Sequence, residues 1–304
     1  EDFVITCQDP FETGYVGRRL SKKFNLPLHL QVHTDFLNPY FRKGVFLNKI
    51  RVYMAKKILP YSSGIRTVSE RIKNSLAQDP KLRILESRIK TLPIFVDTKK
   101  MQDTPVSTDL HKKYPQFNFI ALSLSRLSEE KNIQLAIKAF FETIKKYPRA
   151  GLVIVGSGPQ RRILKLAVLK LGMKNNVVFE EWTDDPVSYY KTANLFLQTS
   201  FYEGYGLALA EAISAGCPAI STDAGIAPEL LSGARVSVIC GLSDAECFSK
   251  GIAWFIEDNS LREEIVQNGQ KNLKSFNPSS KEEYLKMYRE GLEIAVNTWY
   301  SFNK

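Results

Sequence analysis

The sequence has no hydrophobic run long enough to cross a bilayer. A membrane-spanning helix needs about 18 or more mostly apolar residues in succession, and no stretch of the 304 residues approaches that length. Cysteine is scarce, and its four positions show no C-x-x-C or other metal-ligand spacing: Cys7, Cys217, Cys240 and Cys247. Their neighbours are mostly apolar, which predicts buried free thiols in a reducing compartment.

Signatures of nucleic-acid recognition and of metal binding are also lacking. We find no zinc spacing, RNP-like aromatic motif or helix-turn-helix pattern, so we expect no nucleic-acid partner. The candidate site described below has no D-x-D metal motif, because Asp184 and Asp185 are adjacent rather than alternate. The sequence therefore predicts a site without a metal.

Positive charge is concentrated in the first third of the chain. Residues 1–97 carry 17 Lys and Arg against 9 Asp and Glu, a net charge of +8, whereas the remainder carries 25 against 23, or +2. Much of the excess stands in adjacent pairs: Arg18-Arg19, Lys22-Lys23, Arg42-Lys43 and Lys56-Lys57. Such a surface attracts anions, including acidic lipid and phosphorylated acceptors. A solvated surface without a partner is the alternative.

Two blocks of alternating strands and helices follow one another along the chain. The first holds about four short apolar strands, among them Phe3–Cys7 and Leu28–His33, and a basic amphipathic helix at 46–59. The second is more regular and begins with the strand Phe117–Leu124. Apolar, β-branched strands that alternate with helices predict an α/β fold of parallel sheets covered by helices on both faces.

These blocks define the expected domains. We expect a partial N-terminal Rossmann-like domain at 1–97 and a second domain, which holds the candidate ligand site, at 98–280. A helix at 281–304 is expected to pack back on the first domain. A Rossmann-like domain usually has about five to seven strands, so the first domain looks truncated at its start.

The run EGYGLALAE, residues 203–211, carries two glutamates eight positions apart across a glycine-rich turn from a strand to a helix. Glu211, inside the helix, can accept hydrogen bonds from two ribose hydroxyls. Glu203, before the turn, would lie where a sugar ring sits. Taken alone, the run could equally be an exposed glutamate, a loop and a helix cap.

The turn itself suits a diphosphate. Gly204 and Gly206 let the backbone approach a ligand closely. Leu207 and Ala208 then begin a helix, and the free N–H groups and positive dipole end of a helix start attract phosphate.

Two further motifs follow other strands of the second block. Arg126 and Lys131 stand after the first strand, at the edge where open α/β sheets bind ligands, and could neutralise a diphosphate. Gly156 and Gly158, in a Gly-Ser-Gly-Pro turn after the next strand, leave room for a nucleotide. A solvated loop and an ordinary turn are the alternatives.

Taken together, these motifs resemble family 4 of the retaining glycosyltransferases, which have the GT-B fold of two Rossmann-like domains facing a cleft. The matching stretches are SRLSEEKN (125–132), VGSGP (155–159), YYKTANLFLQTSFYEGYGLALAEA (189–212) and AGCPAISTDAGIAPEL (215–230). The segment IFVD at 94–97 departs from the family's usual N-G-V-D, so the contact there is expected to differ.

The resemblance implies that 1–97 is the acceptor-side domain and that 98–280 binds the nucleotide sugar. It also implies a role for each matching residue. Arg126 and Lys131 would bind the diphosphate, Glu211 the ribose and Glu203 the hydroxyls of the donor sugar. The amides of Gly206, Leu207 and Ala208 would face the distal phosphate. His33, in LQVHTD, matches a histidine that commonly lies beside the donor sugar.

The implied function is retaining transfer of a sugar from a nucleotide-diphosphate donor to a saccharide, lipid or other hydroxyl acceptor. The donor, UDP- or GDP-linked, is a co-substrate, and no cofactor is expected. Localisation is expected in the cytoplasm, with the basic first block peripheral at the cytoplasmic face of a membrane. A non-catalytic nucleotide-sugar-binding module and a GT-B phosphorylase or synthase stay open as alternatives.

Overall fold

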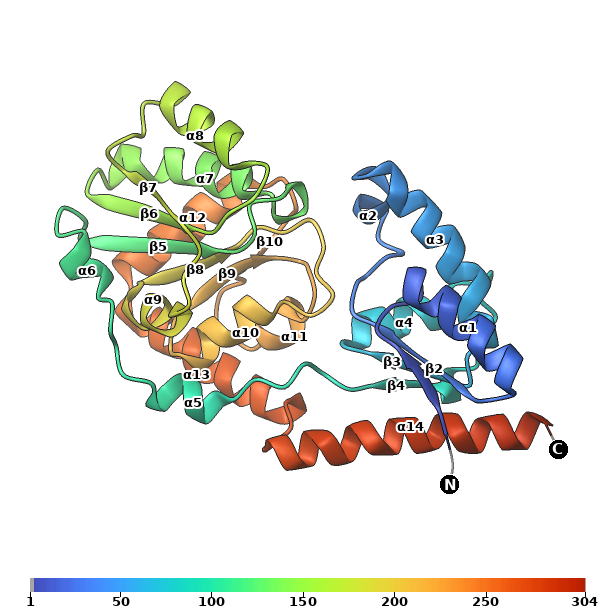
Figure 1. Cartoon of the computed structure of the whole chain (residues 1–304). Coiled ribbons are helices and arrows are strands. Elements are labelled where there is room, and N and C mark those ends of the chain that lie inside the picture. The colour runs from blue at the N-terminus through green and yellow to red at the C-terminus, as the bar shows by residue number, and fades with distance from the viewer. Residues whose placement is uncertain (1–2, 304) are drawn as a thin grey trace. The chain divides into compact units, whose positions relative to one another are not determined.

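The computed structural model describes residues 3–303 and divides into two compact units (Figure 1). Unit 1 contains the residues up to Phe95, Tyr202–Tyr205 and those from Asn277 onward. Unit 2 contains Val96–Phe201 and Gly206–Phe276. The short segment 202–205 of the glutamate-rich turn is thus grouped with unit 1.

Unit 1 is built on a four-stranded parallel sheet whose strands lie in chain order, β1-β2-β3-β4. Every residue of β2 and β3 is buried, as expected for a parallel sheet with both faces covered. The strands are β1 (Ile5–Cys7), β2 (Leu28–Val32), β3 (Gly64–Thr67) and β4 (Ile89–Thr91).

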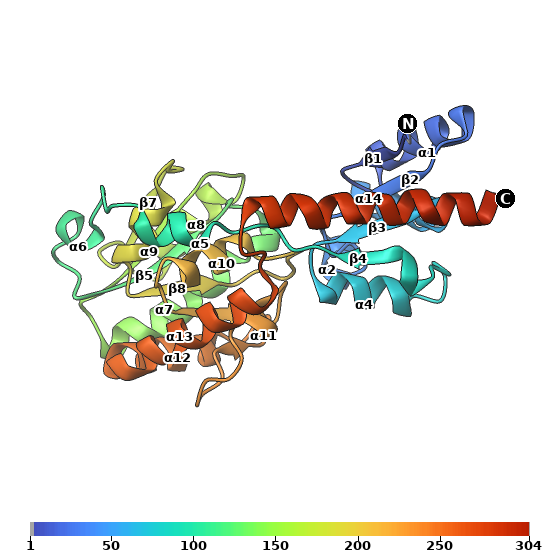
Figure 2. The ribbon, with the colours of Figure 1, turned by 90° about the horizontal axis from the view of Figure 1, so that it is seen from below.

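Helices cover the two faces of this sheet separately. The helices that connect consecutive strands lie on one face and the C-terminal helix lies on the other (Figures 1 and 2). Right-handed crossovers between strands in chain order require this one-sided placement. The helices are α1 (Glu12–Phe24), α2 (Pro39–Lys43), α3 (Phe46–Ile58), α4 (Glu70–Gln78) and α14 (Lys281–Asn303), with 3-10 turns at Leu59–Tyr61 and Glu86–Arg88.

Helix α14 is held on the sheet through a buried arginine. Arg66 of β3 donates to the hydroxyl of Tyr284 at 2.9 Å and to Gln31 Oε1 at 2.7 Å. Gln31 in turn donates to the hydroxyl of Tyr288 at 2.9 Å. The helix approaches so closely that a methyl group on Gly64 would lie 2.7 Å from the Cβ of Ala295. A residue without a side chain is therefore required at this point of β3.

Unit 2 is built on a six-stranded parallel sheet in the order β10-β9-β8-β5-β6-β7. Its order reverses between β5 and β8, which is the position where open α/β sheets bind ligands. The strands are β5 (Phe119–Leu124), β6 (Ala150–Val155), β7 (Val177–Glu180), β8 (Leu195–Gln198), β9 (Ala219–Thr222) and β10 (Ile239–Cys240).

The helices of unit 2 form a layer on each face of the sheet (Figure 1). Helices α7, α8 and α12 contact one another on one face, and α9, α10, α11 and α13 do so on the other. Their bounds, with those of the shorter helices, are α5 (Thr98–Asp103), α6 (Leu110–Lys113), α7 (Ile133–Lys146), α8 (Arg161–Lys170), α9 (Pro186–Thr192), α10 (Leu207–Ser214), α11 (Ala227–Leu230), α12 (Ala245–Glu257) and α13 (Asn259–Phe276), with a 3-10 turn at Glu129–Lys131.

The cysteine prediction is wrong for two of the four thiols. Cys240 and Cys247 form a disulfide, with their Cα atoms 5.8 Å apart, whereas Cys7 and Cys217 are free and buried as predicted. The seven-residue separation comes within bonding distance because a turn folds the start of α12 back beside the end of β10.

Among the described residues, no helix combines the length and apolar character needed to cross a membrane.

Candidate functional site

The loop that carries Arg126 is packed tightly on the glycine turn after the neighbouring strand. Leu127 donates its amide to the carbonyl of Ser157 at 2.7 Å and accepts the amide of Gln160 at 2.9 Å. A methyl group on Gly156, whose φ is +140°, would lie 1.9 Å from the carbonyl oxygen of Ser125. The space that this glycine leaves is therefore filled by the backbone of the Arg126 loop.

Gly158 makes the same kind of contact one turn further on. Its φ is +150°, and an added methyl group would lie 2.5 Å from the carbonyl oxygen of Leu127. The glycine turn thus supports the loop of the two predicted cations, and the room for a nucleotide that the sequence predicts at this turn stays a prediction.

The same loop is tied on its other side to the segment that follows β8. Thr199 donates its hydroxyl to the carbonyl of Lys131 at 2.9 Å, and Phe201 donates its amide to the carbonyl of Glu130 at 2.8 Å. The chain then leads directly into the glutamate-rich turn. Strand ends that are adjacent in the sheet therefore fix the Lys131 backbone against the segment that begins this turn.

Helix α10 begins beside the end of β8. Gly206, with a φ of +99°, precedes the helix, and its carbonyl accepts the amides of Leu209 at 3.0 Å and Ala210 at 3.2 Å. The amides of Leu207 and Ala208 come before these first helical bonds, so helix geometry leaves them for a ligand.

Gln198 connects this helix start to the sheet. Its side-chain oxygen would lie 3.3 Å from a methyl group placed on Gly206, and its Nε2 donates to Ser221 Oγ at 2.9 Å. The consecutive residues Gln198 and Thr199 thus reach Gly206 and Lys131, respectively. Unit 2 therefore brings the cation loop and the helix start together at the end of one strand.

Glu211 lies one turn into α10 and is held by a buried tyrosine. The hydroxyl of Tyr190, on α9, donates to Glu211 Oε2 at 3.2 Å. Burial raises the pKa of Glu211, and the tyrosine hydrogen bond opposes this rise because it favours the carboxylate. The role of Tyr190 was not predicted from the sequence. The one indication of it there is that Tyr190 lies in the stretch 189–212, which resembles the family.

Arg126 and Lys131 differ in their surroundings. The side chain of Arg126 is 75% exposed, and its Nη2 lies 3.4 Å from Glu130 Oε1. Glu130 also accepts the hydroxyl of Ser128 at 2.6 Å, which orients the carboxylate within the loop. Lys131 is half-buried at the end of the 3-10 turn. An exposed arginine with a single partner on its own loop can turn toward an incoming anion at little cost.

Unit 1 holds the remaining predicted residues, His33, Glu203 and Gly204. Ser69, which caps α4, donates its hydroxyl to the carbonyl of Gly204 at 2.8 Å. A methyl group on Gly204 would lie 1.8 Å from the carbonyl oxygen of His33. The backbone of His33 and the side chain of Ser69 thus both contact Gly204, which follows Glu203 in the chain. The bond from Ser69 to Gly204 was not predicted from the sequence.

The surroundings of His33 disfavour the charged form of its imidazole. Burial lowers its pKa, and the positive charge of Arg66 lowers it further, whereas Asp9 raises it. Within the described residues, its Nε2 is buried without a hydrogen-bond partner. A buried nitrogen without a partner is costly, so this atom is suited to a ligand hydroxyl.

The comparison with known families decides the assignment. The family model "Glycosyl transferases group 1" matches residues 108–272, which is more than half of the chain. The chain belongs to this family. The resemblance to family 4 glycosyltransferases and the expected GT-B fold class are therefore confirmed.

Curated relatives of this glycosyltransferase chain include two that align with most of it. An alpha-monoglucosyldiacylglycerol synthase of Streptococcus pneumoniae is 28% identical over 229 residues, which cover 72% of this chain and 51% of that protein. An uncharacterized glycosyltransferase of Methanocaldococcus jannaschii is 27% identical and is covered to 57%, with 75% of this chain aligned. The chain thus spans little more than half the length of these relatives.

Solved glycosyltransferase structures share the fold at low sequence identity. The sucrose-phosphate synthase of Thermosynechococcus elongatus superposes with a TM-score of 0.82 at 20% identity, covering 96% of this chain and 73% of that one. Anabaena HepE in complex with UDP and glucose gives a TM-score of 0.78, also at 20% identity, covering 95% and 77%.

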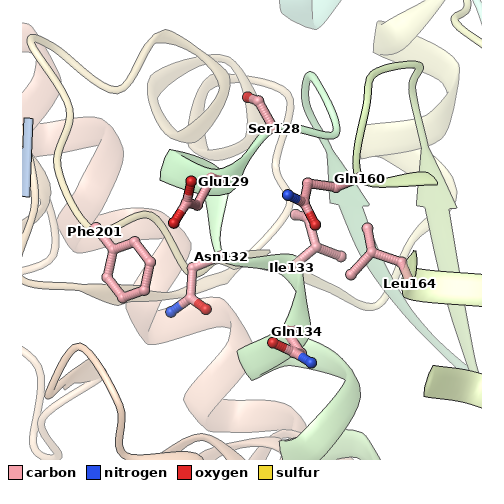
Figure 3. A pocket seen from close by; sticks show the side chains of 8 residues that line it. All are labelled: Ser128, Glu129, Asn132, Ile133, Gln134, Gln160, Leu164 and Phe201. Atoms are coloured by element: carbon pink, nitrogen blue, oxygen red, sulfur yellow. The ribbon is translucent and has the colours of Figure 1, made fainter. Parts of the chain in front are cut away.

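A cavity of about 170 Å³ adjoins the cation loop within unit 2. Figure 3 shows Phe201 and Asn132 on one side of it and Gln160 and Leu164 on the other. Asn132, at the start of α7, donates its side-chain amide to the carbonyl of Leu242 at 3.1 Å. The cavity therefore lies among segments that support the loop, and it is lined by Ser128, Glu129, Asn132, Ile133, Gln134, Gln160, Leu164 and Phe201.

Within residues 3–303, no three His, Cys, Asp or Glu side chains cluster so that they could hold a metal ion.

Proposed function

We propose that this chain binds a nucleotide-diphosphate sugar through unit 2 and transfers the sugar, with retention of configuration, to a hydroxyl acceptor. The observation that carries the proposal is the pair Gln198 and Thr199 at the end of β8. Gln198 lies against Gly206, and Thr199 bonds the backbone of Lys131. One strand end thus positions both an amide-rich helix start and a lysine, a combination that suits a pyrophosphate.

In this proposal the chain's own cations stabilise the leaving group, without a metal. Arg126 and Lys131 neutralise the charge that develops on the distal phosphate as the bond from the anomeric carbon to the phosphate oxygen breaks. The amides of Leu207 and Ala208 add the positive end of α10. The acceptor oxygen bonds to the anomeric carbon on the same face, and its proton passes to the departing phosphate oxygen.

The carboxylates and the histidine take the remaining roles in the proposal. Glu211, held by Tyr190, accepts hydrogen bonds from the ribose hydroxyls, and Glu203 accepts those of the sugar. His33 lies against Gly204, next to Glu203 in the chain, and its unpartnered nitrogen contacts the donor sugar. Gly156 and Gly158 complete the donor site beside the Arg126 loop.

For the acceptor, we propose a lipid at an anionic membrane surface. Two alpha-monoglucosyldiacylglycerol synthases, from Streptococcus pneumoniae and Acholeplasma laidlawii, are 28% and 26% identical to this chain. The net charge of +8 in residues 1–97 favours an anionic surface. For the donor, a UDP sugar is favoured over a GDP sugar, because the structurally similar Anabaena HepE was solved with UDP. The cytoplasmic face of the membrane is the proposed location.

Replacement of Lys131 by alanine tests the catalytic assignment. We expect the rate of sugar transfer in Lys131→Ala to fall at least about 100-fold, because one charge opposite the leaving phosphate is lost. Lys138→Ala is the matched control, since this exposed lysine lies on the adjoining helix α7. Unchanged transfer in Lys131→Ala would reject the assignment, and binding of donor without any transfer by the wild type would favour a non-catalytic module.

A screen of donors by thermal shift tests binding separately from turnover. UDP, GDP and ADP sugars are added to the wild type, and a donor present at about 100 times its Kd should stabilise the native state by about 2.7 kcal/mol. Transfer measured with EDTA tests metal independence, and the anomeric configuration of the product, read by NMR, tests retention.

A further inference from the structure

Unit 1 exposes a set of large apolar side chains on two neighbouring helices. Phe46 of α3 is 74% exposed, and Phe24 of α1 is 58% exposed. On each of the two helices the exposed apolar residues are three or four positions apart, so they form a stripe along the helix. We call these six residues the α1–α3 face: Val16, Leu20 and Phe24 of α1, and Phe46, Ile50 and Tyr53 of α3.

The two helices are fixed side by side (Figure 1). Glu12 of α1 accepts from Arg51 of α3 at 2.9 Å, and Arg18 donates to the carbonyl of Lys57 at 3.3 Å. Arg18 also lies over the ring of Tyr61, 3.6 Å from its centroid. These contacts fix the positions of the two helices, and of the exposed stripes they carry, relative to each other within unit 1.

Basic residues are abundant on the two helices of this face, and acidic residues are few. Helix α1 contains four basic residues and one acid, and that acid, Glu12, is paired with Arg51. Residues 39–58 contain six basic residues and no acid. Cations also lie against exposed rings of the two helices, with Lys57 Nζ 5.7 Å from the Tyr53 ring and Lys23 Nζ 5.3 Å from the Phe24 ring.

We infer that the α1–α3 face inserts into the surface of an anionic lipid bilayer. An amphipathic surface with Phe, Leu and Tyr among Lys and Arg is what binds the boundary between headgroups and acyl chains. A protein partner fits less well, because lysine is depleted in protein interfaces. The inference rests on the acceptor part of the proposed function, because it names the residues that make the membrane contact proposed there. It does not require that the chain transfers a sugar.

Unit 2 offers a matched control surface. Helix α8 also exposes three apolar side chains at helical spacing among basic residues, Ile163 at 53%, Leu166 at 48% and Leu169 at 60%. Helix α8 presents one stripe on a helix of 10 residues, whereas the α1–α3 face combines two stripes on neighbouring helices of 13 residues each, so α8 alone should contribute far less to membrane binding. A comparison of α3 with α8 therefore separates a specific membrane face from general stickiness.

The experiment measures sedimentation of the full chain with vesicles of phosphatidylglycerol and phosphatidylcholine in equal amounts, and with vesicles of phosphatidylcholine alone. We expect the mixed vesicles to bind the chain at least about tenfold more tightly, and binding to weaken as salt is raised. Phe46→Ser/Ile50→Ser/Tyr53→Ser should lower the partition coefficient at least about tenfold. Ile163→Ser/Leu166→Ser/Leu169→Ser should leave it unchanged.

A charge variant guards against misfolding of the serine variant. Lys22→Gln/Lys23→Gln/Lys49→Gln/Lys57→Gln changes only exposed side chains, and it should also weaken binding at least about tenfold. Equal binding to both vesicle types, loss only in the α8 variant, or normal binding of the α3 variant would overturn the inference. So would a dimer that depends on Phe46, because a second copy would then cover the face.

The thermal shift by nucleotide sugars keeps this test distinct from that of the proposed function. The α3 variant should retain the donor-induced shift of the wild type, because its changes lie outside unit 2. Loss of vesicle binding with normal donor binding supports the inference. Vesicle binding by a wild type that binds no donor would reject the proposed function and leave the membrane face standing.

Discussion

Unit 1 and unit 2 share an architecture of parallel strands between layers of helices, but they differ in what they expose. In unit 2 the loops after β5, β6 and β8 are joined by backbone hydrogen bonds and glycine contacts, so the candidate donor site is closely packed. In unit 1 the helical layer exposes Phe46, Phe24 and many lysines. The same kind of scaffold can thus present a rigid set of loops or an adhesive outer face.

Replacement of Gly156 should have the largest effect, and it tests how rigid the loops of unit 2 are. In Gly156→Ala the new methyl group meets the carbonyl of Ser125 and the positive φ is strained, so we expect unit 2 to lose about 4 kcal/mol of unfolding free energy. Urea unfolding followed by tryptophan fluorescence measures the loss.

Gly216→Ala is the control for this prediction. Its φ of +89° imposes similar backbone strain, but no atom lies within 4 Å of the added methyl group. We expect a loss of about 1–2 kcal/mol, from the backbone alone. Equal losses in the two variants would show that the loops after β5 and β6 are not packed as described.

The pH dependence of unit 1 should give an effect of intermediate size. His29, in β2, is buried beside Thr6, and burial, with the charge of Arg66, lowers its pKa to about 4. The unfolded chain binds the proton near pH 6.5, so between these values it holds more protons than the native state. The contribution of His29 to the unfolding free energy should therefore be complete above pH 6.5. The unfolding free energy should fall by about 3 kcal/mol as the pH drops from 6.5 to 4.

The measurement compares urea unfolding at several pH values in wild type, His29→Gln and His111→Gln. The part of the pH dependence that belongs to His29 should disappear in His29→Gln. It should persist in His111→Gln, because His111 lies in unit 2 and not in the sheet of unit 1. Identical curves for wild type and His29→Gln would contradict the buried neutral imidazole.

The disulfide of unit 2 should give the smallest of these effects. Cys240→Ser/Cys247→Ser removes a link across a short loop, and we expect a loss of about 2 kcal/mol from the greater freedom of the unfolded chain. Reductant should lower the stability of the wild type and leave the variant unchanged. Alkylation without reductant should label only Cys7 and Cys217 after unfolding, and labelling of all four would contradict the bridge.

Most strands could be predicted because apolar runs mark them directly. The run FNFIALSL, expected as a strand over 117–124, forms β5 at Phe119–Leu124. Short helices such as α2 and α6, of five and four residues, were not predicted, because a single turn has too few residues to show helical spacing. The disulfide was missed because its formation depends on how the turn between β10 and α12 folds.

Contacts between distant parts of the chain could not be predicted from local patterns. The sequence indicated Arg126, Lys131 and Glu211 as candidates, and their roles stay predictions. The bond from Thr199 to Lys131 joins positions 68 apart, and the bond from Arg66 to Tyr284 joins positions 218 apart. A hydroxyl or a tyrosine that forms such a bond has no special neighbours in sequence, so only the tertiary structure reveals it.

The position of α14 in the chain has a consequence for biosynthesis. The ribosome delivers β1 to β4 first and then all of unit 2, while the helix that covers one face of the first sheet comes only at residues 281–303. Until α14 has been synthesised, Arg66 and the apolar residues around it on this face of the sheet stay uncovered. Unit 2, in contrast, can complete its own core before α14 is made. Chaperones that recognise exposed apolar segments would therefore find their target in the strands of unit 1 until α14 has been made.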